Sequence, residues 1–150
     1  MSPDVIALNP SLTASQVKTA RVKDKKTPPD YEQILYENVI EAGLPIPLRS
    51  RGNKGPTPMK VLGIGYVADF LWVEERIIAE VNGQVWKKGG HNTGYGLQRD
   101  YYKQNLAQLL GFRYFEFSPG MVEDGTALLV LLCAFGRLEV FEQNWKERQP

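Results

Sequence analysis

Two short apolar segments, separated by Glu74 and Glu75, constrain the fold more than any other feature of the sequence. Residues 65–73 and 76–81 are rich in Ile, Val and aromatic residues, a composition typical of β-strands. The two glutamates between them predict an antiparallel hairpin centred on that pair. In this register Asp69 of the first strand lies directly opposite Glu80 of the second.

The predicted position of Asp69 and Glu80 has a chemical consequence. Side chains alternate along a strand, so each acid shares a face with apolar residues, and a buried carboxylate costs free energy unless another group compensates it. Opposed residues of an antiparallel pair have Cβ atoms only about 5 Å apart, so two carboxylates there repel unless a proton or cation lies between them. Two interpretations remain open. The acids share a divalent cation such as Mg²⁺, or they are separate structural acids paired with Arg76 or Lys103.

The other elements follow from helix caps, glycine and proline stops, and apolar periodicity. We predict, in chain order, a helix from an Asp30 N-cap to about 42, strands over 65–73 and 76–81, a glycine-rich loop over 85–96, a helix over 97–110, a strand over 113–117, a turn over 118–120 and a buried helix over 127–134. A strand is the alternative for 127–134, because a short apolar run fits either element. This order predicts an α/β (α+β) fold, a single domain in which a central mixed β-sheet is flanked by helices.

Composition divides the chain into three parts. Residues 1–29 are rich in Pro, Ser, Thr and Lys and predict a flexible basic N-terminal arm. Residues 30–136 form the predicted domain, and residues 137–150 a C-terminal extension. The net charge of +1 indicates no particular partner, although basic residues cluster in three places. These clusters either neutralise phosphates or form solvated loops.

Cysteine and histidine are too few for several kinds of site. Cys133 is the only cysteine and His91 the only histidine, so the sequence excludes an internal disulfide and a zinc site built from cysteines or a histidine pair. The longest apolar run is too short to span a membrane, and the first residues lack the pattern of an export signal. We therefore expect no membrane association.

Several segments, in a fixed order and spacing, carry a resemblance to a known family. They are YVADFLW at 66–72, IAEVNGQVW at 78–86, GH at 90–91, DYYKQN at 100–105 and LLGFRYFEFSPGMV at 109–122, after an opening helix that starts EQIL at 32–35. With these segments the region from about 30 to 128 resembles the PD-(D/E)XK nucleases. It is especially similar to small phage and bacterial endonuclease-like proteins related to the very-short-patch-repair endonucleases.

The resemblance implies a restriction-endonuclease-like fold and a Mg²⁺-dependent DNA endonuclease, with Mn²⁺ as a substitute ion. A metal-activated water would hydrolyse the phosphodiester bond. Asp69 and Glu80 match the acids that bind the metal in this family, and the Val81 carbonyl is a further ligand. Glu32 of the opening helix matches a third catalytic carboxylate.

One position departs from the family pattern. Two residues after the metal-binding glutamate, the superfamily usually has a lysine and the subgroup an acid, whereas this chain has Asn82. We expect Lys103 to replace that lysine, although an ion pair between Lys103 and Asp100 is the alternative. Gln84 lies on the same predicted strand side as Glu80 and is expected to assist catalysis. The residues expected to contact the DNA backbone are Lys87, Lys88, His91, Asn92 and Arg99.

Other functions fit the same residues. A Holliday-junction or branched-DNA resolvase would share this site, and cutting both strands requires a homodimer or two encounters. A catalytically silent DNA-binding module is suggested by Asn82, and a phage structural or interaction protein would keep only the fold. The resemblance implies a cytoplasmic location, in a bacterium or a phage-infected host cell.

Overall fold

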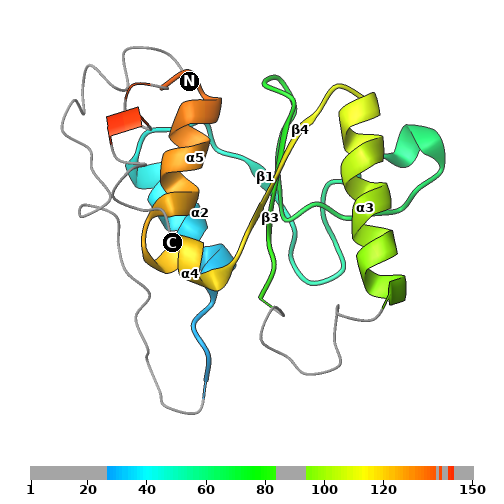
Figure 1. The fold of residues 1–150 in the computed structure, drawn as a ribbon, viewed down its shortest axis with the longest axis horizontal. Helices are drawn as coiled ribbons and strands as arrows, with labels where there is room; N and C mark the ends of the chain where they lie inside the picture. Colours follow the sequence, from blue (N-terminus) through cyan, green and yellow to red (C-terminus); the bar gives the residue numbers. More distant parts are fainter. Residues whose placement is uncertain (1–26, 84–93, 138, 140–141, 144–150) are drawn as a thin grey trace. The chain divides into compact units, whose positions relative to one another are not determined.

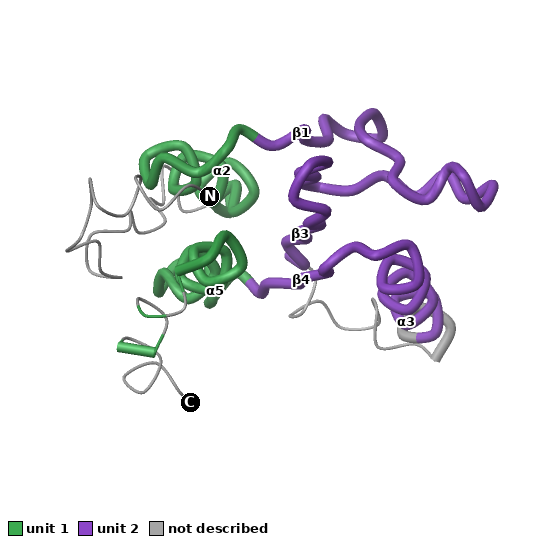
Figure 2. Tube along the Cα trace, turned by 90° about the horizontal axis from the view of Figure 1, so that it is seen from above, with its two compact units in different colours: residues 1–46, 119–150 green, residues 47–118 purple. Residues whose placement is uncertain are grey.

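The computed structural model describes residues 27–83, 94–137, 139 and 142–143. The chain forms two compact units (Figure 2): residues 1–46 together with 119–150, and residues 47–118. Most of the predicted basic arm lies outside the described residues. In the part that is described, no helix is both long and apolar enough to cross a membrane.

The first unit packs three helices against one another in its described part: α2 (Tyr31–Glu41), α4 (Pro119–Glu123) and α5 (Thr126–Ala134). The Asp30 carboxylate caps α2 by accepting a hydrogen bond from the Gln33 N–H at 3.0 Å, so the predicted N-cap is confirmed. The Tyr31 hydroxyl joins α2 to α4 by donating to Glu123 Oε1 at 2.8 Å. Helix α5 is buried on almost every side, which explains its uninterrupted apolar sequence.

The predicted turn over 118–120 is wrong, because Pro119 opens helix α4 instead. Proline is favoured in the first turn of a helix, where its missing N–H would have no partner within the helix. Gly125, with φ of 81°, then separates α4 from α5. The Ser-Pro-Gly sequence predicts a change of chain direction. In the structure this sequence leads into α4, and Gly125 separates α4 from α5.

The second unit contains a mixed sheet with strand order β1-β2-β3-β4. Its elements are β1 (Leu48–Arg49), the short 3₁₀ helix η2 (Lys60–Leu62), β2 (Phe70–Trp72), β3 (Ile77–Val81), α3 (Gly94–Leu109) and β4 (Arg113–Phe117). Figure 1 labels β1, β3 and β4 of this sheet, and helix α3. Strand β2 is antiparallel to β1 and to β3, whereas β4 runs parallel to β3. The α+β class and the mixed sheet are therefore as predicted.

The predicted hairpin is present, in the predicted register. Phe70 pairs with Ala79, Leu71 with Ile78 and Trp72 with Ile77. The first strand is shorter than predicted, because its pairing begins only at Phe70 and the Ala68 N–H bonds to the Pro56 carbonyl. Two further elements, β1 and η2, were not predicted, and α3 begins at Gly94 within the predicted loop.

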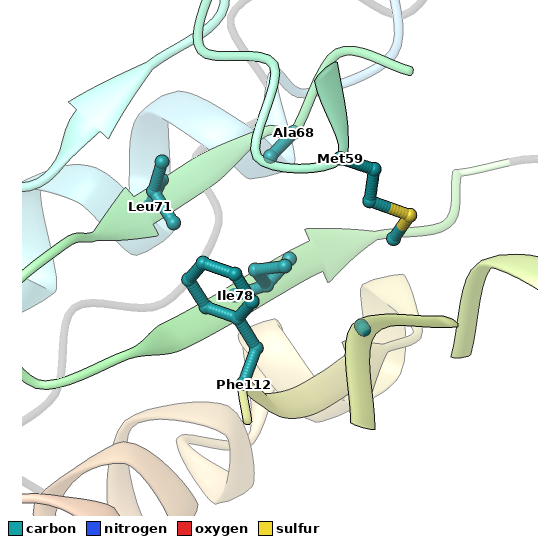
Figure 3. Close-up of a cluster of buried hydrophobic side chains, with 6 residues drawn as sticks. Met59, Ala68, Leu71, Ile78 and Phe112 are labelled. Atoms are coloured by element: carbon teal, nitrogen blue, oxygen red, sulfur yellow. The ribbon is translucent and has the colours of Figure 1, made fainter. Parts of the chain in front are cut away.

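A cluster of buried side chains holds α3 and the sheet together (Figure 3): Met59, Ala68, Leu71, Ile78, Ala107 and Phe112. In Figure 3, Leu71 of β2, Ile78 of β3 and Phe112 converge on one another. Since side chains alternate along strands, Leu71 and Ile78 define the sheet face that packs against α3. Glu80 continues this face along β3, so it lies where the apolar cluster ends.

Candidate active site

Asp69 is fixed by hydrogen bonds on two sides. Its Oδ2 accepts the Val81 N–H at 2.8 Å, and its main-chain carbonyl accepts the Ser50 N–H at 3.0 Å. The carboxylate thereby continues the β2–β3 pairing beyond Phe70 and Ala79, the last backbone pair. A half-buried acid is thus held against the end of β3, beside the peptide that joins Glu80 to Val81.

Glu80 lies in β3, half-buried, with its Oε1 shielded from solvent. The parallel register places Glu116 of β4 beside it on the same face. Glu116 is held there by two amides, since Asn82 Nδ2 donates to its Oε1 at 3.5 Å and Gln104 Nε2 donates to its Oε2 at 3.1 Å. Like charges on neighbouring strands are destabilising. The arrangement therefore concentrates negative charge next to Glu80.

The Tyr114 hydroxyl responds to this charge. Burial raises its pKa well above the usual range, and four nearby carboxylates raise it further, those of Glu80, Glu116, Asp100 and Asp69 in decreasing order. Each of these acids disfavours a second negative charge at the same place. Burial among these acids thus keeps Tyr114 a neutral phenol.

Lys103, on α3, carries a positive charge that favours the ionised form of Asp69. Burial raises the pKa of Asp69, whereas the Val81 N–H and the Lys103 charge oppose that rise. The Lys103 Nζ lies 4.4 Å from the centroid of the Tyr66 ring, a cation–π arrangement. Lys103 is therefore positioned by an aromatic ring while its charge acts on the carboxylate.

Arg76, the other suggested partner of the acids, has different contacts. Its guanidinium donates to the carbonyls of Leu110 and Gly111 and lies 4.4 Å from the centroid of the Phe112 ring. These contacts hold the carboxyl end of α3 to the hairpin turn, where Arg76 has φ of 55°. Arg76 thus has a structural role at the end of α3.

The remaining predicted site residues lie in the second unit, in the first unit or outside the described residues. Arg99 is exposed on α3, in the same unit as Asp69 and Glu80. Glu32 belongs to the first unit, in the first turn of α2. The predicted catalytic residue Gln84 and four predicted DNA contacts fall outside the described residues: Lys87, Lys88, His91 and Asn92. The structure thus groups Asp69, Glu80, Val81 and Lys103.

Sequence reasoning missed Glu116 and Tyr114 as neighbours of this group. The alternation of 113–117 puts both side chains on one face of a strand, which is a readable signal. It becomes informative only when β4 is known to pair with β3, and that pairing joins segments more than thirty residues apart.

The donor set can be tested against the expected ion. Among the described residues, no group of three or more His, Cys, Asp and Glu side chains is arranged to hold a metal. Mg²⁺, however, is commonly bound by one or two carboxylates and completes its shell with water and substrate phosphate. Asp69 and Glu80 provide such hard oxygen donors, and the Val81 carbonyl could add a third. These hard oxygen donors are of the kind that Mg²⁺ prefers, and they differ from the cysteine and histidine ligands of structural zinc.

Comparison of the chain with protein-family models, curated proteins and solved structures finds no match. The resemblance to the PD-(D/E)XK nucleases consequently depends on the segments quoted above. The function is therefore inferred from the geometry around Asp69.

Replacing Asp69 by Asn should raise the melting temperature at neutral pH by a few degrees. Burial raises the pKa of this carboxyl, so the folded chain binds its proton more tightly than the unfolded chain. Its stabilising contribution is then present in acid and lost as the pH rises through the folded pKa. Asn keeps an acceptor for the Val81 N–H without the charge.

Thermal unfolding followed by circular dichroism with EDTA, between about pH 4 and pH 8, measures this effect. The gain of Asp69→Asn over wild type should shrink as the pH falls toward the value for an unperturbed aspartate. Glu74→Gln, at an exposed position in the same hairpin, is the control and should show no such trend. A variant less stable than wild type at pH 8 would contradict the argument.

Proposed function

We propose that the chain is a Mg²⁺-dependent DNA endonuclease with a restriction-endonuclease-like fold. The observation that carries the proposal is the attachment of the Asp69 carboxylate to the Val81 N–H, at the end of the strand that bears Glu80. It holds Asp69 against the peptide that joins Glu80 to Val81, at the end of the inner strand β3, in the hairpin register that the sequence predicts. The mixed sheet and the flanking helix α3 are compatible with such a fold.

In this proposal Asp69, Glu80 and the Val81 carbonyl hold Mg²⁺. When bound, the ion would lower the pKa of a water molecule and offset negative charge on the phosphate. Lys103 orients the attacking water and stabilises charge that develops at the phosphate, as a preorganised cation does. Glu32 and Gln84 are the further catalytic residues of the proposal, and Gln84 helps to place the attacking water. Water attacks phosphorus and the bond to the 3′ oxygen breaks, which leaves 5′-phosphate and 3′-hydroxyl ends.

The position of the cations supports DNA as the substrate. Arg99 and Lys103 are four residues apart on α3, so they share one face of the helix. That face carries the cation that acts on Asp69. Two positive side chains on one helix face, one of which acts on Asp69, suit a phosphodiester backbone, which needs cations for binding. The DNA contacts proposed in addition are Lys87, Lys88, His91 and Asn92.

A plasmid-nicking assay tests the proposal. The full chain is incubated with supercoiled DNA in Mg²⁺, in Mn²⁺ and in EDTA, and in parallel with a four-way junction. We expect nicked product with either ion and none with EDTA. Intact plasmid and intact junction under every condition, from a folded chain that still binds DNA, would refute the nuclease proposal.

Binding of DNA without catalysis is the second candidate. It is favoured by Asn82, a neutral residue where the superfamily has lysine, whose amide donates to Glu116. A silent binder would show a steep dependence of affinity on salt, since phosphate contacts release counterions. It would release no product with either ion, so the same assay separates the two candidates.

A further inference from the structure

A depression of about 490 Å³ lies in the second unit, between the segment that precedes β2 and helix α3. Its volume is within the range of pockets that hold small ligands, roughly 300–1,000 Å³. The side chains that matter for its chemistry are Met59, Tyr66, Arg99, Tyr102, Lys103 and Leu106. The depression therefore combines apolar side chains, aromatic rings and cations.

The α3 side of the depression follows from helical spacing. Arg99, Tyr102, Lys103 and Leu106 occupy positions i, i+3, i+4 and i+7, which form one face of a helix. Leu106 packs against the apolar cluster, whereas Tyr102 is 60% exposed. A large, mostly exposed aromatic side chain thus lines the depression on the same helix face as two cations.

Lys103 connects this depression to the carboxylates. It lines the depression and lies over the Tyr66 ring, and its charge also acts on Asp69. A ligand in the depression that pairs with Lys103 is consequently adjacent to the group proposed to hold the metal.

We propose that the depression receives a single unpaired nucleobase of a DNA strand, with Tyr102 stacked on the base and Arg99 and Lys103 paired with the adjoining phosphates. This inference rests on the proposed function and names its substrate class. Aromatic side chains stack on any base, and cations bind the backbone that links the bases. A base inside a duplex cannot enter such a pocket without leaving the stack. The preferred substrate therefore carries an unpaired nucleotide.

The test compares two fluorescein-labelled short duplexes of the same sequence, one fully paired and one with a single bulged thymidine. Binding is measured by fluorescence anisotropy in EDTA, so that no cleavage occurs. Wild type should bind the bulged duplex about tenfold more tightly, the effect of stacking on one base. Tyr102→Ala should abolish this preference.

Tyr101→Ala is the matched control, because Tyr101 is 59% exposed on the same helix and does not line the depression. It should retain the preference. Arg99→Gln should weaken binding and lower the salt slope by about one, as the loss of one phosphate contact does. Equal affinity of wild type for both duplexes, or a preference that survives in Tyr102→Ala, would overturn the inference. Displacement of the bulged duplex by an equimolar amount of thymidine monophosphate would also overturn it.

The outcome is separable from that of the nicking assay. A chain that nicks plasmid but shows no preference for the bulge keeps the proposed function and loses this inference. A preference that depends on Tyr102, in a chain that cuts no DNA, supports the pocket and removes the nuclease.

Discussion

Asp69→Asn and Glu80→Gln should each lower the rate of DNA cleavage by about a thousandfold or more. Each change keeps the size of the side chain and an oxygen acceptor, and removes the charge that holds a divalent ion. Charge stabilisation by such an ion is worth several kcal/mol at the transition state, and each 1.36 kcal/mol changes the rate about tenfold. The Asn variant should nevertheless fold, because its amide oxygen can still accept the Val81 N–H.

Initial rates of plasmid nicking, with Mg²⁺ and enzyme in excess, measure this loss. Glu74→Gln is the control, since it removes one acid from an exposed position of the same hairpin. Its rate should remain within about twofold of wild type, as is usual for surface substitutions. Equal nicking by wild type, Asp69→Asn and Glu80→Gln would show that the two acids take no part in cleavage.

Ile78→Ala should destabilise the chain by about 2–5 kcal/mol, the range for removing a large aliphatic side chain from a core. Ile78 is 0% exposed, is the second residue of β3, and belongs to the cluster that holds α3 to the sheet (Figure 3). The cavity left by the deletion is bordered by β2 and the end of α3. These elements cannot collapse into it without disturbing the pairing that positions Asp69.

Equilibrium unfolding in urea measures the change, and Ile46→Ala is the matched control. Ile46 is 72% exposed, so the same deletion should alter stability by less than about 0.5 kcal/mol. If both variants lose similar stability, the cluster does not act as the core described here.

Local patterns account for the parts of the fold that the sequence predicts well. The Asp30 cap needs only the N–H three residues along, and the hairpin register needs only a short turn with apolar segments on each side. The start of β2 depends instead on Pro56, whose carbonyl takes the Ala68 N–H and ends the extended alternation. The apolar periodicity within 65–73 does not predict this hydrogen bond between Ala68 and Pro56.

The candidate site also has one feature that the sequence predicts and several that it does not. The proximity of Asp69 to the end of β3 follows from the hairpin and is predictable. The neighbours Glu116 and Tyr114 lie near Glu80 because β4 pairs in parallel with β3, after a crossover through α3. The cation–π contact of Lys103 with Tyr66 likewise joins a helix to an irregular segment that was predicted as strand. Contacts of this kind depend on tertiary packing and leave no local pattern.

Titration of Mn²⁺ into the metal-free chain, followed by calorimetry, tests directly whether Asp69 and Glu80 hold a shared divalent ion. We predict saturable binding of one ion per chain, retained in Glu74→Gln and lost in both Asp69→Asn and Glu80→Gln. Unchanged Mn²⁺ affinity in the two site variants, or no binding by a folded wild-type chain, would contradict the account.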